Sequence, residues 1–359
     1  MEGLLTLGTW LRAQGIAAEV AGDSVRPGED LDGHLRRAGV PWAAPRLALS
    51  RKVRLRDVIA DARRLSEWVA AGRFDLLHAS FPHDHHLILR AAARAGPLRA
   101  DLRTVRTAHR RRDVSPGFLG QRTRALRQTD GTVVHADSYR RELLRQGLSP
   151  DRVAAIPGSV DSARFTPGRA PLLRAEWGIP EDAPVAGMVA RMKPERGHRE
   201  LIAAFNQAAI PGAYLVLIGR GDDEEALRAL AAGQPRIVLA GYTRGDDLIG
   251  AYRALDVGVW LREGNDGACR GVLEAMACGL PMIVGNDGAP PELVAETGRV
   301  VDPADPAAIA SALRDLLGDP DAARALGRAA RARAETFTHE RYGAAVLAFW
   351  RRLRELPPI

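Results

Sequence analysis

The chain has 359 residues, more than the roughly 250–300 at which a single hydrophobic core stops growing, so its length predicts two domains. Hydrophobic residues make up 46% and charged residues 26%, as in soluble globular proteins, and the absence of an apolar run of about 18 residues argues against a membrane span. The two cysteines, Cys269 and Cys278, cannot build a disulfide framework and lack metal-site spacing. These features, and an opening sequence without signal-peptide character, predict a reducing, cytoplasmic setting.

Charge is distributed unevenly along the chain, whose formal net charge is +7. Residues 1–165 hold 28 Arg or Lys and 18 Asp or Glu, whereas the remainder holds 23 and 26. A basic first half favours an anionic partner, unless it only reflects an arginine-rich composition with two lysines, Lys52 and Lys193. Nucleic acid is not predicted as that partner, because the basic residues lack interleaved aromatic residues and a nucleic-acid motif.

The first half opens with a helical pattern, in which Leu4, Leu7 and Leu11 share one face. A doubly wound domain normally opens with a strand and a glycine-rich turn, so the first strand of this domain is predicted to be missing. The segment 157–184 is rich in Pro and Gly and predicts an interdomain linker. Strands are predicted at 16–22, 74–80, 102–108, 131–136 and 153–160.

The second half alternates short apolar runs with helical segments such as 198–209 and 222–232. This alternation predicts a parallel sheet covered by helices on both faces, with ligands bound beyond the carboxyl ends of the strands. After about residue 305 the chain is predicted to be helical to its end. Strands are predicted at 184–190, 213–219, 236–240, 256–261 and 280–285.

The segment EGNDGACRGVLEAMACGLP, residues 263–281, is predicted to be a loop followed by a helix. Glu274, about one turn into that helix, can accept hydrogen bonds from the two hydroxyls of a ribose, and Asp266 can hold a second hydroxyl-bearing ring. Together they predict a nucleoside-diphosphate sugar as ligand; the alternative is a solvated loop with Glu274 on the polar face of an ordinary helix. The amides at the helix N-terminus, where the dipole favours an anion, would come from Gly267, Ala268, Cys269 and Arg270.

A second segment, ARMKPERG, supports a phosphate site. Arg191 and Arg196 lie at the carboxyl end of a predicted strand, where two guanidinium groups suit bidentate phosphate contacts and would stabilise a departing diphosphate. Surface arginines in an arginine-rich chain are the alternative interpretation. Gly219 and Gly221 follow the next predicted strand and add a weaker signal.

Residues 184–302 resemble the donor domain of the retaining family-4 glycosyltransferases throughout, in the runs ARMKPERG, LVLIGRG, LAGYTRGDDLIGAYRALDVGVW, LEAMACGLPMIV and GRVVDP. The first half resembles the family more loosely, through FDLLHAS, VRTAHR and AAIPGSVDSARFTPG. The resemblance implies the GT-B fold, an α/β architecture of two Rossmann-like doubly wound domains facing a central cleft. It places the acceptor domain at 1–165 and the donor domain at 166–337, with a helix at 338–356 packed back on the first domain.

The resemblance also implies roles for single residues. Glu274 should hold the ribose and Asp266 the hydroxyls of the transferred sugar, while Arg191 and Arg196 should hold the diphosphate. His109 matches the histidine that faces the donor sugar from the first domain, although a satisfied loop histidine is its alternative. The same alignment of motifs places Tyr242, Gly219, Gly221 and residues 267–270 among the donor-binding residues.

The implied activity is transfer of a sugar from a nucleoside-diphosphate sugar to an acceptor hydroxyl with retention of configuration, in the synthesis of a cell-surface polysaccharide or glycolipid. The acceptor would be a glycan or a lipid-linked intermediate, and no metal or other cofactor is expected. Because no enzyme nucleophile is evident, the expected chemistry takes place on one face of the sugar. An epimerase or a phosphorylase on the same fold is a further alternative, although no lysine suited to a phosphorylase cofactor is evident.

Two departures from the family pattern weigh against full activity. The first carboxylate of the pair is an aspartate, Asp266, where the family has glutamate. The family's opening strand and GG-x-E loop are also missing: Glu2 would occupy the position of that glutamate, without the glycines. Either the chain starts too late, or it is an inactive or truncated relative that still binds nucleotide sugars.

Three polar segments are less informative. The run HDHH at 83–86 is expected in a loop after a strand and could bind a metal, although it lacks a partner cluster. The basic segments 50–57 and 106–117 could contact anionic lipid head groups or an acidic glycan, which would place the protein at the inner membrane face. A solvated basic surface is the alternative.

Overall fold

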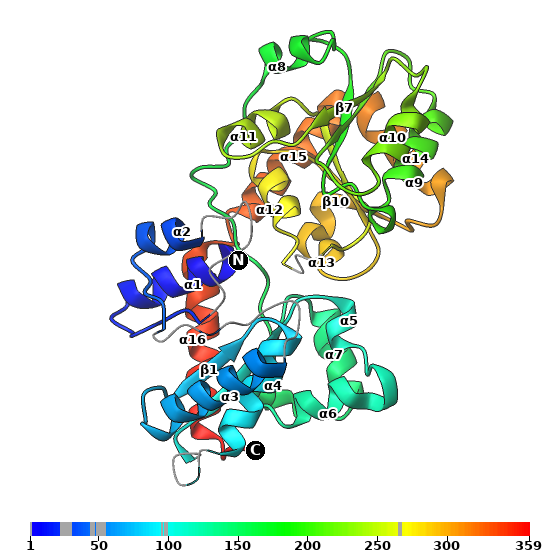
Figure 1. Cartoon of the computed structure of the whole chain (residues 1–359). Coiled ribbons are helices and arrows are strands. Elements are labelled where there is room, and N and C mark those ends of the chain that lie inside the picture. The colour runs from blue at the N-terminus through cyan, green and yellow to red at the C-terminus, as the bar shows by residue number, and fades with distance from the viewer. Residues whose placement is uncertain are drawn as a thin grey trace. The chain divides into compact units, whose positions relative to one another are not determined.

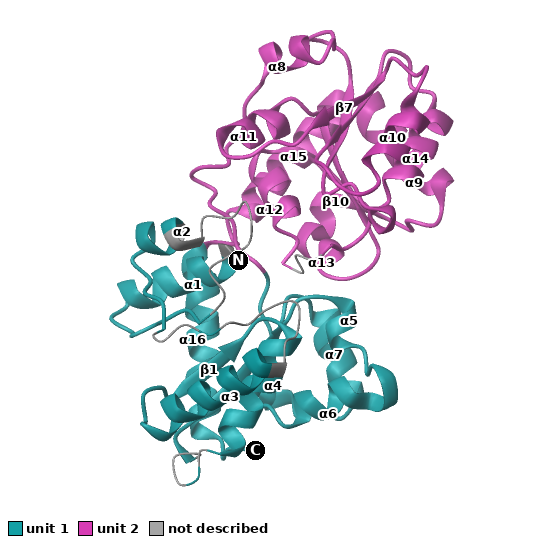
Figure 2. Cartoon of the chain, viewed as in Figure 1, with its two compact units in different colours: residues 1–157, 339–359 teal, residues 158–338 magenta. Residues whose placement is uncertain are grey.

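The computed structural model describes residues 2–21, 31–43, 47, 55–94, 96, 100–264 and 268–359. The chain forms two compact units, shown in Figure 2: unit 1 comprises residues 1–157 and 339–359, and unit 2 comprises residues 158–338. The division therefore falls at 157/158, where the sequence predicted 165/166. The C-terminal segment belongs to unit 1.

Unit 1 contains a parallel sheet with helices (Figure 1). Its first two helices, α1 and α2, precede the described strands, and its last helix, α16, is contributed by the C-terminal segment. Its helices and strands are α1 (Glu2–Ala13), α2 (Leu31–Arg37), α3 (Leu55–Ala70), β1 (Leu76–Ala79), α4 (Pro82–Ala93), β2 (Arg103–Ala108), α5 (Arg111–Val114), η2 (Phe118–Gly120), α6 (Gln121–Arg127), β3 (Gly131–Val134), α7 (Asp137–Arg145), η3 (Pro150–Arg152), β4 (Val153–Ala155) and α16 (His339–Glu355).

The sheet of unit 1 has the order β1-β2-β3-β4, with every neighbouring pair parallel. Four of the five strands predicted for this half are confirmed. The prediction of a strand at 16–22 was wrong for its described residues, because Val20 forms only an isolated parallel bridge with Trp42. Among the described residues β1 is the edge strand of the sheet. The segment around Val20 therefore pairs with no strand of the sheet, and its single bridge is not extended into a ladder.

Helix α1 packs against α16, which Figure 1 shows side by side. The indole Nε1 of Trp10 donates a hydrogen bond to Oε2 of Glu340 at 2.6 Å. Gly343 permits the close approach, since a Cβ there would lie 2.3 Å from the Trp10 ring. Leu7 and Leu11 of the predicted apolar face are buried. The opening helix is thereby confirmed, and burial against α16 is what stabilises it.

Unit 2 alternates strands and helices as the sequence predicted, and β10 is the one strand of this unit that was not among the predicted runs. Pro320 and Pro306 open the last two helices at a position where a missing N–H costs nothing. Its elements are α8 (Pro171–Glu176), β5 (Val185–Val189), η4 (Pro194–Arg196), α9 (His198–Ala208), β6 (Tyr214–Ile218), α10 (Glu224–Ala231), β7 (Ile237–Gly241), α11 (Asp246–Arg253), β8 (Val257–Trp260), α12 (Arg270–Ala277), β9 (Met282–Gly285), α13 (Pro290–Val294), η5 (Ala295–Thr297), β10 (Gly298–Val301), α14 (Pro306–Gly318) and α15 (Pro320–Ala334).

The sheet of unit 2 has the order β10-β9-β8-β5-β6-β7, and all its pairs are parallel. The chain thus runs outward from β5 to β7 and then, starting again beside β5, outward from β8 to β10. This is the doubly wound order, whose direction reverses between β5 and β8. The four inner strands β9, β8, β5 and β6 are buried on both faces, as their unbroken apolar runs require, whereas the edge strands β7 and β10 are partly exposed. Ligands of such sheets bind where the loops after β5 and β8 meet.

The segment 157–184, predicted to be an interdomain linker, begins at the division between the units, but from residue 158 onward it belongs to unit 2. It contains α8, and the Arg174 side chain in that helix is buried in unit 2. Arg174 Nε donates to the carbonyl of Ala254 at 2.8 Å, and Nη2 contacts Oδ2 of Asp256 at 3.0 Å. Pro171 opens α8, and Gly178, with φ 70°, follows its C-cap residue.

Candidate functional site

Arg191 lies two residues beyond the end of β5, at the reversal point of the unit 2 sheet, and its side chain is exposed. It is therefore available to an anion at the edge where the loops after β5 and β8 emerge. The strand pattern of the sequence alone predicted this position.

The two glycines after β6, Gly219 and Gly221, allow the loop after β6 to pack against the loop after β5. A Cβ at Gly219 would lie 1.9 Å from the carbonyl oxygen of Ala190, and one at Gly221 would lie 2.0 Å from that of Met192. The N–H of Met192 donates to the carbonyl of Arg220 at 3.1 Å. Loop packing by itself therefore requires both glycines.

Arg196 is buried, with only 4% of its surface exposed. Its guanidinium carbon lies 4.4 Å from the centre of the Trp260 ring, and Nη1 donates to the carbonyl of Arg262 at 2.7 Å. Gly264 makes room for it, because a Cβ there would meet Nη1 at 2.3 Å. Arg196 thus ties the loop after β5 to the loop after β8, so the interpretation of it as a simple surface arginine was wrong.

Glu274 is also buried, on helix α12, with 7% of its surface exposed. Its Oε2 accepts a hydrogen bond from the phenol of Tyr252 at 2.9 Å, and its Oε1 lies 3.2 Å from Nε of Arg270. A carboxylate is buried only where partners compensate the lost hydration. The alternative that placed Glu274 on a solvated polar face was therefore wrong.

Helix α12 begins just after a residue in the left-handed conformation. Cys269, its N-cap, has φ 47° and is fully buried, and it makes no side-chain capping hydrogen bond. Ala268 and Arg270 are partly exposed beside it. Asp266 and Gly267 lie outside the described residues, so the structure places only the second carboxylate of the predicted pair.

Tyr242 follows β7 and is 56% exposed. The guanidinium carbon of Arg220 lies 4.4 Å from the centre of its ring. An exposed aromatic ring stacked on an arginine is a flat surface on which another planar group can stack. Tyr242 was predicted as a donor-binding residue through the family resemblance alone.

His198, the first residue of α9, was missed by sequence analysis. It is 1% exposed, and neither ring nitrogen has a hydrogen-bond partner among the residues that the structure describes. Burial first, and then the charge of Arg196, lowers its pKa to about 4, so the ring is neutral. Nothing in the run RGHRE indicates burial, since a histidine after Gly197 is equally compatible with an exposed helix start.

In unit 1, His109 directly follows β2, and its imidazole faces another histidine. Its Nδ1 lies 3.1 Å from Nε2 of His135, and the ring centres are 5.2 Å apart. Its backbone N–H donates to Oδ2 of Asp113 at 3.2 Å. Burial, followed by His135 and Arg106, lowers the pKa of His109 to about 2. His109 is thus a neutral, partly exposed ring held from one side by a residue that sequence analysis missed.

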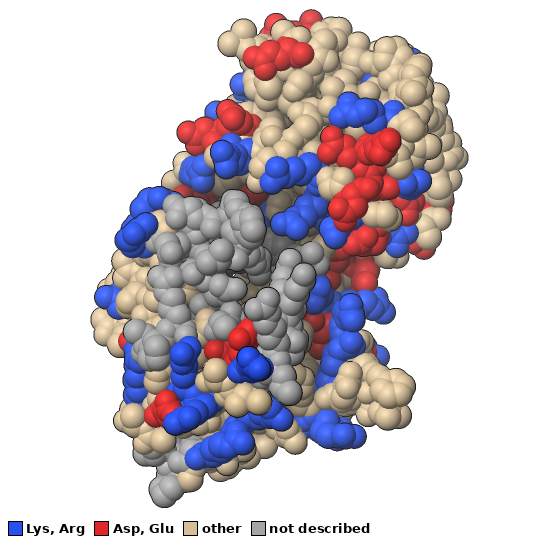
Figure 3. All heavy atoms as spheres, in the orientation of Figure 1, with Lys and Arg blue, Asp and Glu red and all other residues tan. Residues whose placement is uncertain are grey.

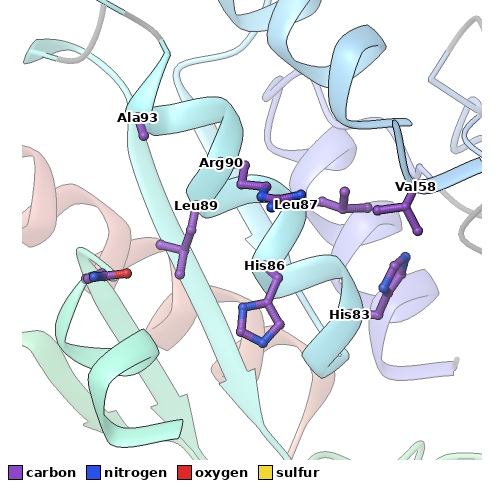
Figure 4. Close-up of a pocket in the computed structure, with 8 residues that line it drawn as sticks. Val58, His83, His86, Leu87, Leu89, Arg90 and Ala93 are labelled. Atoms are coloured by element: carbon purple, nitrogen blue, oxygen red, sulfur yellow. The ribbon is translucent and has the colours of Figure 1, made fainter. Parts of the chain in front are cut away.

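The HDHH run forms the first turns of helix α4, which corrects its prediction as a loop. His85 points into unit 1, where its Nε2 lies 2.6 Å from Oγ1 of Thr129. Figure 4 shows His83 and His86 instead at a surface pocket of about 420 Å³. No group of three potential metal ligands is found in the described part of the chain. The pocket is lined by Val58, His83, His86, Leu87, Leu89, Arg90, Ala93 and Gln128.

The basic character of the first half is visible on the surface. On the face shown in Figure 3, Lys and Arg outnumber acidic side chains over unit 1, whereas acidic and basic side chains are mixed over unit 2. In the segment 106–117, Arg106 is buried, and Arg111 and Arg112 are exposed on α5. Residues 50–54 of the other basic segment lie outside the described residues. No helix in the described ranges has both the length and the apolar character needed to cross a membrane.

Comparison with known families matches nearly the whole chain. Residues 170–333 match the family described as Glycosyl transferases group 1. Residues 3–164 match the family described as Glycosyltransferase Family 4. The two matches meet close to the division between the units.

Two curated relatives and one solved structure extend this comparison. The chain is 34% identical over 193 residues to a GDP-mannose-dependent monoacylated alpha-(1-6)-phosphatidylinositol monomannoside mannosyltransferase of Corynebacterium glutamicum, covering 50% of the chain and 51% of that relative. It is 32% identical over 258 residues to the GDP-mannose-dependent alpha-(1-6)-phosphatidylinositol monomannoside mannosyltransferase of Mycolicibacterium smegmatis, covering 66% and 67%. The chain thus spans about half the length of the first relative. The structure of Anabaena HepE in complex with UDP-glucose matches with a TM-score of 0.76 at 18% identity, over 96% of this chain and 95% of that one, which shows a shared fold.

Proposed function

Since the chain belongs to glycosyltransferase family 4, we propose that it moves a sugar from a nucleoside-diphosphate sugar to an acceptor hydroxyl with retention of configuration. One observation carries the proposal. A buried carboxylate, Glu274, lies one turn inside the helix that follows β8, at the reversal point of a doubly wound sheet. This is the part of such a sheet where nucleotides bind.

The donor would be held by unit 2. Glu274 would accept hydrogen bonds from the ribose hydroxyls, with Tyr252 and Arg270 orienting the carboxylate. Arg191, the charge of Arg196 and the N-terminus of α12 would bind the diphosphate. Asp266 would hold hydroxyls of the transferred sugar. Further donor contacts are proposed for Gly219, Gly221, Tyr242, Ala268 and Cys269.

The proposed chemistry uses no enzyme nucleophile. The bond from the anomeric carbon to the diphosphate breaks, the acceptor oxygen bonds to the same face of that carbon, and the acceptor proton passes to the leaving phosphate oxygen. Arg191, Arg196 and the helix dipole would stabilise the charge that develops on that oxygen. Because these groups supply positive charge, we propose that turnover needs no metal and survives EDTA.

His109 of unit 1 would accept a hydrogen bond from a hydroxyl of the transferred sugar. This role comes from the family resemblance, and the neutral state of the ring supports it, because a neutral imidazole offers one lone pair to a hydroxyl.

The proposed acceptor is a glycan or a glycolipid. The names of the two curated relatives and the basic surface of unit 1 support an acceptor with an anionic head group. We also propose a cytoplasmic protein that contacts the inner membrane face peripherally. Sedimentation with anionic and with neutral vesicles tests this, and equal binding to both would contradict it.

The test of the function uses a panel of UDP- and GDP-sugars. One or more should raise the melting temperature of the protein and yield a glycosylated product by mass spectrometry. Glu274→Ala should abolish turnover while the circular dichroism spectrum is unchanged, and near-normal turnover would overturn the role of Glu274. Donor binding without product for every acceptor tried would instead favour an inactive relative.

A further inference from the structure

Two large apolar side chains protrude next to each other from unit 1. Phe118 and Leu119, in η2, are 76% and 79% exposed, and among the described residues they are the only exposed large apolar side chains that are neighbours in the sequence. Leu119 has φ 50°, a left-handed conformation that a leucine rarely adopts, and Gly117 and Gly120 on either side have φ 73° and 68°. A single exposed apolar residue is common, whereas an adjacent pair presented by a costly backbone conformation indicates a contact surface. We call Phe118 and Leu119 the apolar tip.

The turn that carries the apolar tip is held in shape by Arg122. The backbone N–H of Arg122 donates to the carbonyl of Pro116 at 3.1 Å, and its Nη1 donates to Oγ of Ser115 at 3.0 Å. A Cβ at Gly117 would lie 3.1 Å from Cγ of Arg122, so the arginine side chain packs directly against the turn. The apolar tip is therefore presented by a hydrogen-bonded turn.

The surroundings of the apolar tip are basic. Residues 110–127 contain six arginines and a single acidic residue, Asp113, which is buried. Arg112 of α5 and both Arg124 and Arg127 of α6 are exposed. Figure 3, in the orientation of Figure 1, shows an uncharged lobe beside α5 and α6 with basic side chains above and below it. A partner for this surface must therefore offer an apolar interior and a negatively charged exterior.

We propose that Phe118 and Leu119 insert into the outer layer of an anionic lipid bilayer while the arginines around them bind lipid phosphates. A bilayer takes up hydrocarbon side chains, and its anionic head groups attract guanidinium groups, so one partner accounts for both features. An apolar groove on a protein would account for the tip alone. The apolar tip follows His109 by nine residues, so its insertion holds the proposed sugar-binding loop of unit 1 near a lipid-linked acceptor. The inference rests on the proposed membrane contact and is independent of sugar transfer.

The apolar tip is tested by sedimentation of the full chain with vesicles of equal parts phosphatidylglycerol and phosphatidylcholine. Phe118→Ser/Leu119→Ser should lower the partition coefficient about tenfold or more, because each side chain loses its burial in the bilayer. Leu119→Ser alone should lower it several-fold. Leu172→Ser is the matched control and should bind as wild type does, since Leu172 is an 81% exposed leucine on α8 of unit 2. Wild-type binding by the double variant would overturn the proposal.

The arginines are tested in the same assay by Arg112→Gln/Arg124→Gln. Losing two cations beside an anionic surface should lower the partition coefficient about tenfold, and added salt should reduce the difference. Arg314→Gln/Arg328→Gln removes the same net charge from exposed positions on α14 and α15 and should have little effect. Equal losses in the two double variants would mean that only net charge matters, which contradicts a local contact.

Insertion itself is tested by Leu119→Cys labelled with an environment-sensitive fluorophore. The native cysteines, Cys269 and Cys278, are both buried, so the label reports on the new thiol. Its emission should shift to the blue on anionic vesicles and be quenched by brominated lipids. Vesicle-bound protein whose label is not quenched would overturn the proposal, as would a dimer in solution that Phe118→Ser/Leu119→Ser dissociates, because the tip would then join two copies of the chain.

The outcomes separate the apolar tip from the proposed function. If wild type binds anionic vesicles and the tip variant binds them equally well, only the apolar tip is wrong. If wild type binds no vesicles, the proposed membrane contact fails together with the tip. Sugar transfer is measured separately with the panel of nucleotide sugars, so its failure leaves the vesicle result unaffected.

Discussion

The phenol of Tyr252 donates a hydrogen bond to the Glu274 carboxylate at 2.9 Å, and both side chains are buried in unit 2. Tyr252 comes from α11 and Glu274 from α12, on either side of β8. The hydrogen bond therefore holds the proposed ribose-binding carboxylate in place. It comes from α11, which supplies none of the proposed donor contacts. The Nε atom of Arg270 lies 3.2 Å from the other carboxylate oxygen, Oε1.

Tyr252→Phe should lower the free energy of unfolding by about 1–3 kcal/mol, because a buried carboxylate oxygen loses its donor. Urea denaturation measures the change. Tyr342→Phe is the control, since Tyr342 is partly buried on α16 and its hydroxyl makes no hydrogen bond to any described residue. Equal effects in the two variants would contradict the assignment.

Arg196→Lys should lower the unfolding free energy by about 1 kcal/mol, since an ammonium group cannot reproduce the planar stacking on Trp260 together with the bond to the Arg262 carbonyl. Arg191→Lys, at the exposed neighbouring position, should leave stability unchanged. Both are compared by urea denaturation. An unchanged free energy of unfolding in Arg196→Lys would show that the stacking on Trp260 does not contribute to stability.

Gly221→Ala should destabilise the protein by more than about 2 kcal/mol, because its Cβ would lie 2.0 Å from the carbonyl oxygen of Met192 and the loop after β5 would have to move. Gly318→Ala is the matched control, as its Cβ meets nothing within 4 Å. Melting temperatures of the two variants test this. Similar values would mean that the two loops are not packed as described.

Stability should fall on acidification partly through His198. Its folded-state pKa, about 4, is below the ordinary 6.5, so the unfolded chain binds the proton first and stability is lost as the pH drops from 6.5 toward 4. His198→Gln should therefore lose about 2 kcal/mol less than wild type between pH 7 and pH 5. Urea denaturation at the two pH values measures the difference, and parallel losses would contradict a buried neutral His198.

The sequence determined the architecture of unit 2 because buried parallel strands are unbroken apolar runs. Such a run can be recognised from consecutive residues alone, without knowledge of the neighbouring strands. Five of its six strands were predicted within one or two residues. The exception, β10, is half exposed at the edge of the sheet, where Arg299 and Val300 blur the pattern. The strand prediction at 16–22 failed for the opposite reason: an apolar segment becomes a strand only if a neighbour supplies hydrogen bonds, and Val20 has a single bridge.

The positions of Arg191, Arg196 and Glu274 also followed from the sequence, because the ends of parallel strands gather at one edge whatever the side chains are. The residues that these side chains contact could not be predicted from the sequence. Trp260 beneath Arg196, Tyr252 on Glu274 and His135 behind His109 lie far from them along the chain or on other elements, and only packing brings them together. Burial and ionisation depend on those partners, since the cost of a buried charge is set by what surrounds it. The sequence thus determined where the chemical groups stand along the strands, and the tertiary structure decided the state in which each of them is held.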